Sequence, residues 1–289
     1  MPFFGLPGRI LAALLAVYLI WGSTYLAISV TLRDLAPFVM ASSRFLTAGA
    51  LLYLWLRLVR REPAPPMHQW AGSAALSFLL LLIGHGGVVF AQQWVPSSLA
   101  ALAVASMPIW AAVFASFAGR LNRPLDILAI VLGFVGVVFL NLDGALRGAG
   151  PGMLALIVAP LAWAFGSMFS HRLPAPGGLM MSATQMLTGG LWLALASLAL
   201  GEPAPERLTL WPFLGWLWQV VAGSLVAFTA YLYLLNHVRP ALATSYAFVN
   251  PVIAVLLGVG LAGERLDPWG WLGTVIIVTA VAVLTLGKK

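Results

Sequence analysis

A histidine in the stretch "IGHGG" is the residue of this sequence whose type and place most suggest chemistry. His85 lies near the middle of an apolar run at 70–94, where an ionisable side chain is expected to serve function. One helical face is predicted to carry Phe78, Leu82, His85, Val89 and Gln92. There His85 could hydrogen-bond a substrate carboxylate or amine, or carry a proton. A neutral imidazole bonded to a carbonyl across a glycine-lined helix contact is the structural alternative, and both stay open.

Aromatic residues form the second group of candidates. Tyr18, Trp21 and Tyr25 share a face of one apolar run, and Trp163 lies in its counterpart further along. Trp and Tyr near the ends of membrane spans usually anchor them at the interface, but Trp21 and Trp163 are closer to mid-span. An aromatic, weakly polar cavity would suit amphipathic amino acids, aromatic ones included.

The third group is a polar track in "RPALATSYAFVNPVIAVLLG" (239–258). It consists of Thr244, Ser245, Tyr246 and Asn250, and it is expected to face Ser106 and Met107 of an earlier apolar run. Hydrogen bonding between helices, at about 0.6 kcal/mol per contact, is the alternative to ligand binding. We expect packing for Ser245, whereas both interpretations stay open for Tyr246 and Asn250.

Charged residues are almost absent from the apolar runs. The acidic residues all fall in or beside loops: Asp34, Glu62, Asp126, Asp143, Glu202, Glu206, Glu264 and Asp267. This counts against a cation exporter that uses a buried glutamate, and it weakens a proton relay through carboxylates. Arg44 is the exception among the bases, several residues inside a run. We expect it to be structural, paired with a helix-end carbonyl or extended toward the interface.

Composition identifies the class of protein. Of the 289 residues, 62% are apolar and 8% charged, against about 25% charged in a soluble domain, so the chain is predicted to be an integral membrane protein. The net charge of +7 does not indicate nucleic-acid binding, because the basic residues lie singly or in pairs between apolar runs instead of in a patch. There is no cysteine, which excludes disulfides and thiolate metal sites, and no cofactor is expected.

Ten membrane spans are predicted from the apolar runs, since a spanning helix needs about 20 residues. They cover 10–32, 37–56, 70–94, 98–118, 127–142, 152–171, 178–199, 212–236, 241–261 and 269–286. With the N-terminus in the cytoplasm, ten Lys and Arg residues fall on the cytoplasmic side: Arg9, Arg57, Arg60, Arg61, Arg120, Arg123, Arg172, Arg239, Lys288 and Lys289. Four fall opposite: Arg33, Arg147, Arg207 and Arg265. This bias predicts cytoplasmic termini.

The second half of the chain repeats the first. "MASSRFLTAG" (40–49) matches "MSATQMLTGG" (181–190), and "IWGSTY" (20–25) matches "AFGSMF" (164–169). We therefore divide the chain into repeats at 1–145 and 146–289. Each has five predicted spans, an odd number, so the second must enter the membrane from the opposite side. Inverted repeats are typical of secondary transporters, which bind substrate near the midplane.

Prolines mark two kinds of place in the repeats. Pro96 and Pro240 start their helices, where a missing N–H costs little. Pro108 and Pro251 lie deep inside predicted helices, where proline frees a carbonyl and bends the helix. We predict that this pair forms hinges for alternate opening of the two sides; static kinks are the alternative.

The most specific stretches resemble a known family. "WGSTYLAI" (21–28), "LAWAFGS" (161–167), "VNPV" within 239–258 and "GERL" (263–266) are similar to the EamA-type branch of the drug/metabolite transporter superfamily, especially the YddG and YedA group of exporters. The resemblance covers essentially the whole chain. It implies a basket-like monomer of ten helices with a central cavity, exporting amino acids or related small metabolites across the bacterial inner membrane.

Two other functional classes fit the sequence less well. An intramembrane enzyme acting on lipids would need a nucleophile, a metal cluster or paired acids at one depth, and no HExxH, GxSxG or aspartate pair occurs. A receptor or scaffold would need large soluble loops, whereas these loops are short. The sequence thus predicts a transporter of amino acids or of a related drug or nucleotide-sugar-like metabolite. Its substrate-binding candidates are Trp21, Tyr25, Phe78, His85, Gln92, Trp163, Tyr246 and Asn250.

Overall fold

The computed structural model describes residues 7–117, 124–139, 150–238, 243, 246–265 and 267–286. In these ranges the chain forms helices and no strand. Helix occurs in all ten predicted spans. Thr244, Ser245 and Pro240 of the predicted polar track and helix start lie outside the described residues.

In its described residues, the first half has eight helical segments. They are α1 (Gly8–Thr31), α2 (Pro37–Leu58), α3 (Met67–Ser77), the π-helix η2 (Phe78–Gly86), α4 (Gly87–Ala91), α5 (Ser97–Val104), α6 (Met107–Phe117) and α7 (Pro124–Phe139). The segments α3, η2 and α4 follow one another without a break and fill the third predicted span.

The second half follows the same plan. It comprises α8 (Pro151–Phe169), the short 3-10 helix η3 (Ser170–Arg172), α9 (Gly178–Ala199), α10 (Leu210–Trp218), the π-helix η4 (Gln219–Phe228), α11 (Thr229–His237), α13 (Tyr246–Leu261) and α14 (Pro268–Leu286). A long π-helix therefore occurs in the third helix of each half, although π-helices are rare and mostly single-turn.

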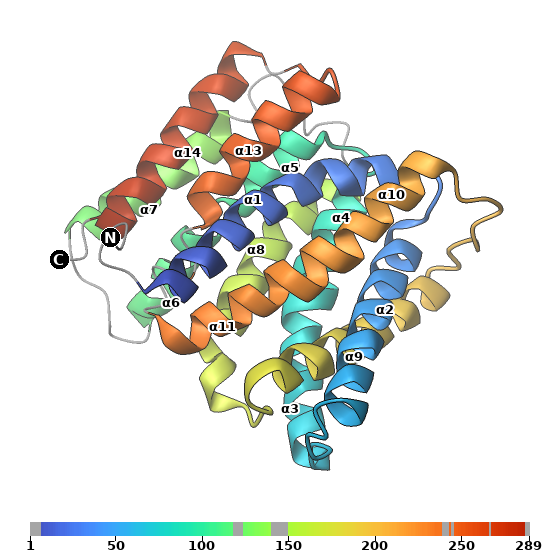
Figure 1. Cartoon of the computed structure of the whole chain (residues 1–289). Helices are drawn as coiled ribbons and strands as arrows, with labels where there is room; N and C mark the ends of the chain where they lie inside the picture. Colours follow the sequence, from blue (N-terminus) through green and yellow to red (C-terminus); the bar gives the residue numbers. More distant parts are fainter. Residues whose placement is uncertain are drawn as a thin grey trace.

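Helices at equivalent places in the two halves pack against each other. Helix α2 lies along α9, and α7 lies along α14 (Figure 1). A Cβ atom added to Gly49 would come within 2.9 Å of the Leu187 main-chain nitrogen, and one added to Gly190 within 2.9 Å of the Leu46 nitrogen. The sequence repeat aligns Gly49 with Gly190 and Leu46 with Leu187, so α2 and α9 make the same backbone contact twice, with the halves exchanged.

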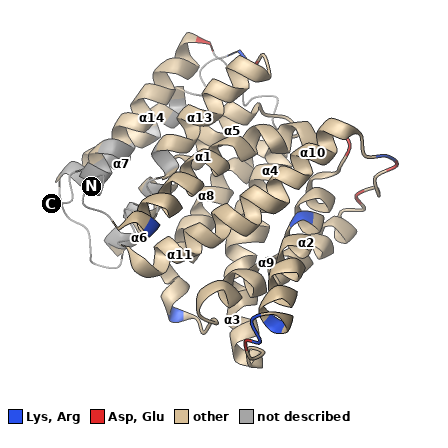
Figure 2. Cartoon of the chain, in the orientation of Figure 1, with Lys and Arg blue, Asp and Glu red and all other residues tan. Residues whose placement is uncertain are grey.

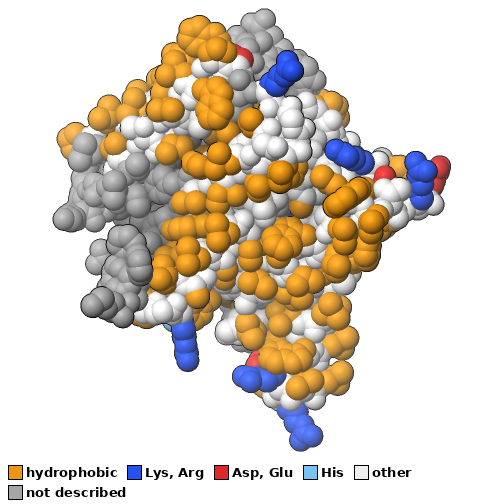
Figure 3. Space-filling model, turned by 45° about the horizontal axis from the view of Figure 1, so that its top comes forward, with side chains coloured by type: hydrophobic (Ala, Val, Ile, Leu, Met, Phe, Trp, Pro, Cys, Tyr) orange, Lys and Arg blue, Asp and Glu red, His pale blue; other side chains and the backbone are white. Residues whose placement is uncertain are grey.

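The outside of the molecule is largely apolar. Hydrophobic side chains cover much of the face in Figure 3, with Lys and Arg toward its edges, and exposed residues include Leu198, Trp211 and Leu256. Six helical stretches in the described ranges are long and apolar enough to cross a membrane: Gly8–Thr31, Pro37–Leu58, Met67–Ala91, Pro151–Arg172, Gly178–Ala199 and Leu210–His237. Such a surface suits a bilayer, because lipid solvates apolar side chains but cannot hydrogen-bond exposed backbone groups.

Three carboxylates tie the halves together at helix starts. Glu202 accepts hydrogen bonds from the main-chain N–H groups of Phe38 (3.1 Å) and Val39 (2.9 Å) in α2. Glu264 accepts from the Ser97 N–H (2.9 Å), the Ser97 hydroxyl (2.6 Å) and the Ser98 N–H (3.1 Å) of α5. A negative charge is favourable at these sites, because the first N–H groups of a helix have no partner within the helix.

The third tie is Asp34, which accepts from the main-chain N–H (2.6 Å) and the hydroxyl (2.5 Å) of Thr209, just before α10. These hydrogen bonds hold the pKa of Asp34 below its ordinary value. The three ties lie at helix ends that the charge count assigns to the outer side. Basic side chains instead gather beside the lower ends of α2 and α3 in Figure 2.

Candidate functional site

A cavity lies where helices of both halves meet. Its empty volume, including its open part, is about 640 Å³. The first half contributes Trp21, Thr24, Tyr25, Ile28, Arg44, Phe45, Leu81, Gly84, His85, Val88 and Val104, and the second Ala159, Pro160, Trp163, Phe228, Tyr246 and Asn250. The walls are mainly aromatic and apolar, with a few polar groups, as is usual for a small-molecule site.

Trp21, Trp163 and Tyr246 form one wall of this cavity, and Tyr231 packs against them. Trp21 of α1 contacts Trp163 of α8, Tyr231 of α11 and Tyr246 of α13, with ring centroids 5.8, 5.1 and 5.0 Å apart. The Trp163 indole N–H donates to the Tyr231 hydroxyl over 3.2 Å, and Ser167 shares a 2.8 Å bond with the same oxygen. Edge-on contacts of this kind hold rings in a defined arrangement, so the wall is built before any ligand arrives.

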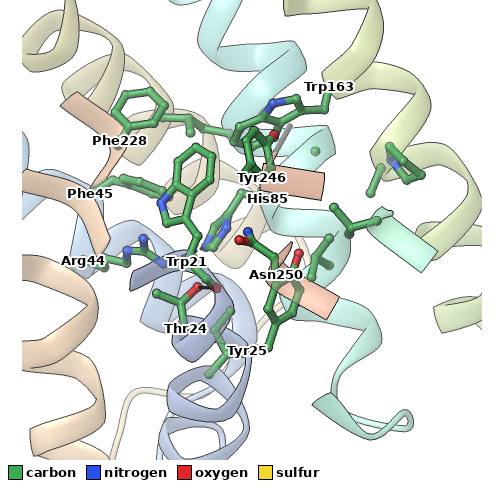
Figure 4. Close-up of a pocket in the computed structure, with 17 residues that line it drawn as sticks. Trp21, Thr24, Tyr25, Arg44, Phe45, His85, Trp163, Phe228, Tyr246 and Asn250 are labelled. Atoms are coloured by element: carbon green, nitrogen blue, oxygen red, sulfur yellow. Dashed lines mark hydrogen bonds between the residues drawn. The ribbon is translucent and has the colours of Figure 1, made fainter. Parts of the chain in front are cut away.

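Arg44 and His85 form the polar part of the cavity. Arg44 is 2% exposed, and its Nη1 lies 3.2 Å from His85 Nε2. Figure 4 shows the two side chains directed toward each other beside Trp21. The guanidinium also lies over the Phe45 ring, 4.7 Å from its centroid, an arrangement that favours a cation.

The π-helix η2 presents His85 to the cavity, and the flanking glycines let other helices approach it. A Cβ at Gly84 would lie 2.8 Å from the Trp163 ring, and one at Gly87 would lie 3.2 Å from Ala159 Cβ. Helix α8 can therefore lie directly against η2, which brings Trp163 and His85 to the same cavity.

The sequence profile of the EamA-like transporter family matches the chain twice, at residues 8–142 and 150–286. The chain belongs to the EamA-like transporter family.

Among relatives of this EamA-family chain, the "Uncharacterized inner membrane transporter YedA" of Escherichia coli K12 is 42% identical over 289 residues, covering 100% of this chain and 92% of that protein. "Protein PecM" of Dickeya dadantii is 28% identical, with 92% and 88% covered. A solved structure described only as the crystal structure of a protein shares the fold, with a TM-score of 0.68, 21% identity and 96% of both chains covered.

The structure brings together six of the eight predicted site residues of the EamA chain: Trp21, Tyr25, His85, Trp163, Tyr246 and Asn250 line the cavity. Asn250 links α13 to α1 when its amide is oriented to suit its neighbours. Its nitrogen then donates to the main-chain oxygens of Tyr18 (3.0 Å) and Tyr246 (3.2 Å).

Phe78 and Gln92 do not line the cavity. Phe78 is 39% exposed and packs edge-on against Trp192. The predicted face assumed an α-helix, but η2 spans Phe78–Gly86, and its wider turns rotate Phe78 away from His85. Gln92 is buried and donates to the Tyr25 main-chain oxygen over 3.0 Å. It therefore holds α1 in place beside the cavity.

Arg44 was expected to pair with a helix-end carbonyl or to extend toward the interface, and the structure shows neither. Its partners in the described part of the chain are the side chains of Ser224, Gln219 and His85. The position of Arg44 inside an apolar run could have identified it as a functional-site residue. Phe45, Phe228 and Thr24 carried no comparable signal, because an aromatic or hydroxyl residue in an apolar run is ordinary.

The two proposed hinge prolines occupy different settings. Helix α5 ends at Val104 and α6 begins at Met107, so Pro108 is the second residue of a new helix and not an interior residue as predicted. Proline is compatible with this place because the first N–H groups of a helix are unpaired. Pro251 lies inside α13, as predicted. Pro160 of α8, which lines the cavity, is a further interior proline.

Proposed function

We propose that this chain is a secondary transporter that exports amino acids, aromatic ones included, and related small metabolites across the bacterial inner membrane by alternating access. The observation that carries the proposal is a cavity whose walls come from both halves of the chain. A site shared in this way changes its exposure when one half rocks against the other. The chain is proposed to act as a monomer with both termini in the cytoplasm.

Several features support an inverted pair of repeats at 1–145 and 146–289. The family profile matches each half once. The exchanged contacts of Gly49 and Gly190 fit an approximate two-fold axis between α2 and α9. The long π-helices η2 and η4 occupy corresponding helices. Pro251 and the break before Pro108 are the proposed hinges.

The aromatic wall supports the proposed substrate class. Trp21, Trp163 and Tyr246 offer ring faces and edges to an apolar side chain. Asn250 and Thr24 add polar groups in the same cavity. Drugs or nucleotide-sugar-like metabolites are the alternative cargo for this fold.

Efflux from proteoliposomes tests the proposal. Vesicles containing the purified protein are loaded with labelled amino acids, and release is compared with that from protein-free vesicles. We expect faster release for apolar and aromatic amino acids. Gly84→Ala should slow this release because its Cβ displaces Trp163, whereas Gly8→Ala, with nothing within 4 Å, should not. No release across a broad panel would refute the proposal.

A further inference from the structure

A cation with no anionic partner among the described residues lies in the cavity wall. Arg44 is the eighth residue of α2, so it lies about 10 Å from the start of that helix at 1.5 Å per residue. A charged side chain inside a bilayer is energetically costly and marks functional pathways. In the described part of the chain, all the hydrogen-bond partners of Arg44 are neutral side chains.

The donors of the guanidinium are only partly used. Nε donates to the Ser224 hydroxyl over 2.8 Å, and Nη1 faces Gln219 Oε1 and His85 Nε2, both at 3.2 Å. An arginine has five N–H groups, so both hydrogens of Nη2 have no acceptor among the described residues. Gly223 lets Nη2 approach the backbone of η4 closely, since a Cβ there would lie 2.8 Å from Nη2.

His85 adds another donor. Arginine can only donate, so the 3.2 Å contact requires Nε2 of His85 to accept. This places the ring proton on Nδ1, which has no hydrogen-bond partner among the described residues. The neighbouring Phe45 ring, edge-on to His85 at 5.1 Å between centroids, restrains the imidazole. One cavity thus combines a fixed positive charge with unused N–H donors.

We infer that Arg44 and His85 form the subsite for a carboxylate of the transported solute. Guanidinium groups suit carboxylates because their N–H donors can bind both oxygens in parallel. The wall of Trp21, Trp163 and Tyr246 lies in the same cavity and accepts an apolar or aromatic body. The ligand class is therefore an organic acid with one carboxylate and an apolar body, amino acids included. This inference rests on the proposed function and narrows it.

A purely structural arginine is the competing explanation, because Arg44 also links α2 to η2 and η4. The two explanations differ in selectivity. A structural arginine affects folded yield and leaves the preference among ligands unchanged, whereas a carboxylate site makes affinity depend on the ligand's charge.

Matched acids and amides distinguish these explanations. The probes are L-phenylalanine and L-phenylalaninamide, L-leucine and L-leucinamide, and 3-phenylpropionate and 3-phenylpropionamide. Affinities are measured from thermal stabilisation of the purified full-length protein, and efflux is measured in proteoliposomes. Hydrogen bonds to a charged group contribute enough for the acids to bind about 10- to 100-fold more tightly than the amides.

Three variants complete the experiment. Arg44→Gln should bring the acid-to-amide ratio close to one. Arg44→Lys keeps the charge but loses the parallel N–H donors that bind both carboxylate oxygens, and it should give an intermediate acid-to-amide ratio. Arg57→Gln removes an arginine from the last turn of the same helix, outside the cavity, and should leave the ratio as in the unaltered protein. If Arg44→Gln does not fold, the Arg44→Lys ratio decides.

Each result has a defined meaning. Equal affinity of the unaltered protein for acid and amide, or a ratio that survives both Arg44 variants, overturns the carboxylate site while the proposed transport function stands. Absence of binding and efflux for every pair overturns the proposed function and the carboxylate site together. A ratio that falls with Arg44 and not with Arg57 supports the site.

Discussion

Replacing Glu264 by glutamine should weaken the contact between the loop after α13 and the start of α5. The carboxylate accepts three hydrogen bonds from Ser97 and Ser98. Gly258 provides the space, because a Cβ there would collide with the Glu264 carboxylate. Glutamine has a similar shape but no charge, and its amide nitrogen would face a main-chain donor.

The size of the effect follows from two terms. A negative charge at a helix N-terminus contributes about 0.3–1 kcal/mol when exposed and up to about 2 kcal/mol when partly buried. Hydrogen bonds to a charged group contribute about 1.5–3 kcal/mol, and the half-buried position of Glu264 reduces this through solvent screening. We expect Glu264→Gln to lower the free energy of unfolding by about 1–2 kcal/mol. This corresponds to a fall in Tm of roughly 2–8 °C.

The pH dependence of this difference has a definite sign. Partial burial raises the pKa of Glu264, but the hydrogen bonds from Ser97 and Ser98 outweigh it and keep the pKa below its ordinary value of 4.5. A lowered carboxyl pKa stabilises the folded state above the unfolded pKa and ceases to do so as pH falls through the folded one. The Tm difference between the unaltered protein and Glu264→Gln should be constant from about pH 6 to 8 and shrink below about pH 4.5.

Thermal unfolding of detergent-purified protein, followed by helical circular dichroism, measures both quantities. The control is Glu206→Gln, which removes the same charge from an exposed residue and should change Tm little. Equal shifts for the two variants, or a Glu264→Gln difference that grows toward acid pH, would refute the reasoning.

Two further predictions concern the repeats. Gly49→Ala and Gly190→Ala should destabilise the protein to a similar extent, about 1–3 kcal/mol each, because both new Cβ atoms would press on backbone across the α2–α9 contact. Gly260→Ala, with nothing within 4 Å, is their control, and unequal losses of Tm would contradict the exchanged contact. Single cysteines at residues 1 and 145 should react with impermeant reagents from opposite sides of the membrane. The chain has no other cysteine. Labelling of both cysteines from the same side of the membrane would exclude an inverted second repeat.

Much of the fold was predictable because membrane helices follow simple rules. Apolar runs of sufficient length have to form helices in lipid, and proline at Pro37, Pro151 and Pro268 marks helix starts. The family resemblance proposed from "WGSTYLAI" and "VNPV" is confirmed by the profile match and by YedA. Six of the predicted site residues line the cavity, and the sequence singled them out because Trp, Tyr, His and Asn are unusual in mid-span.

The positions that the sequence did not predict depend on helix rotation and on packing. Phe78 lies away from the cavity because η2 is π-helical, and an α-helical count does not anticipate its turns. Gln92 lies outside the cavity lining because its buried amide donates to the Tyr25 main-chain oxygen, and sequence alone does not distinguish that partner from a ligand. The partners of Arg44 come from η2 and η4, far from it along the chain, and no local pattern reveals them.

Composition and the length of the apolar runs determined by themselves that this chain is an all-helical membrane protein, and short motifs such as "WGSTYLAI" and "VNPV" carried the resemblance to the EamA type. This is possible because the free energy of transferring a helix into lipid depends mainly on its residue types and its length. The tertiary structure decided which side chains share the cavity, and that Arg44 faces His85 with no carboxylate partner among the described residues. Such contacts depend on helix rotation and close approach at glycines, which are set by all the neighbouring helices together.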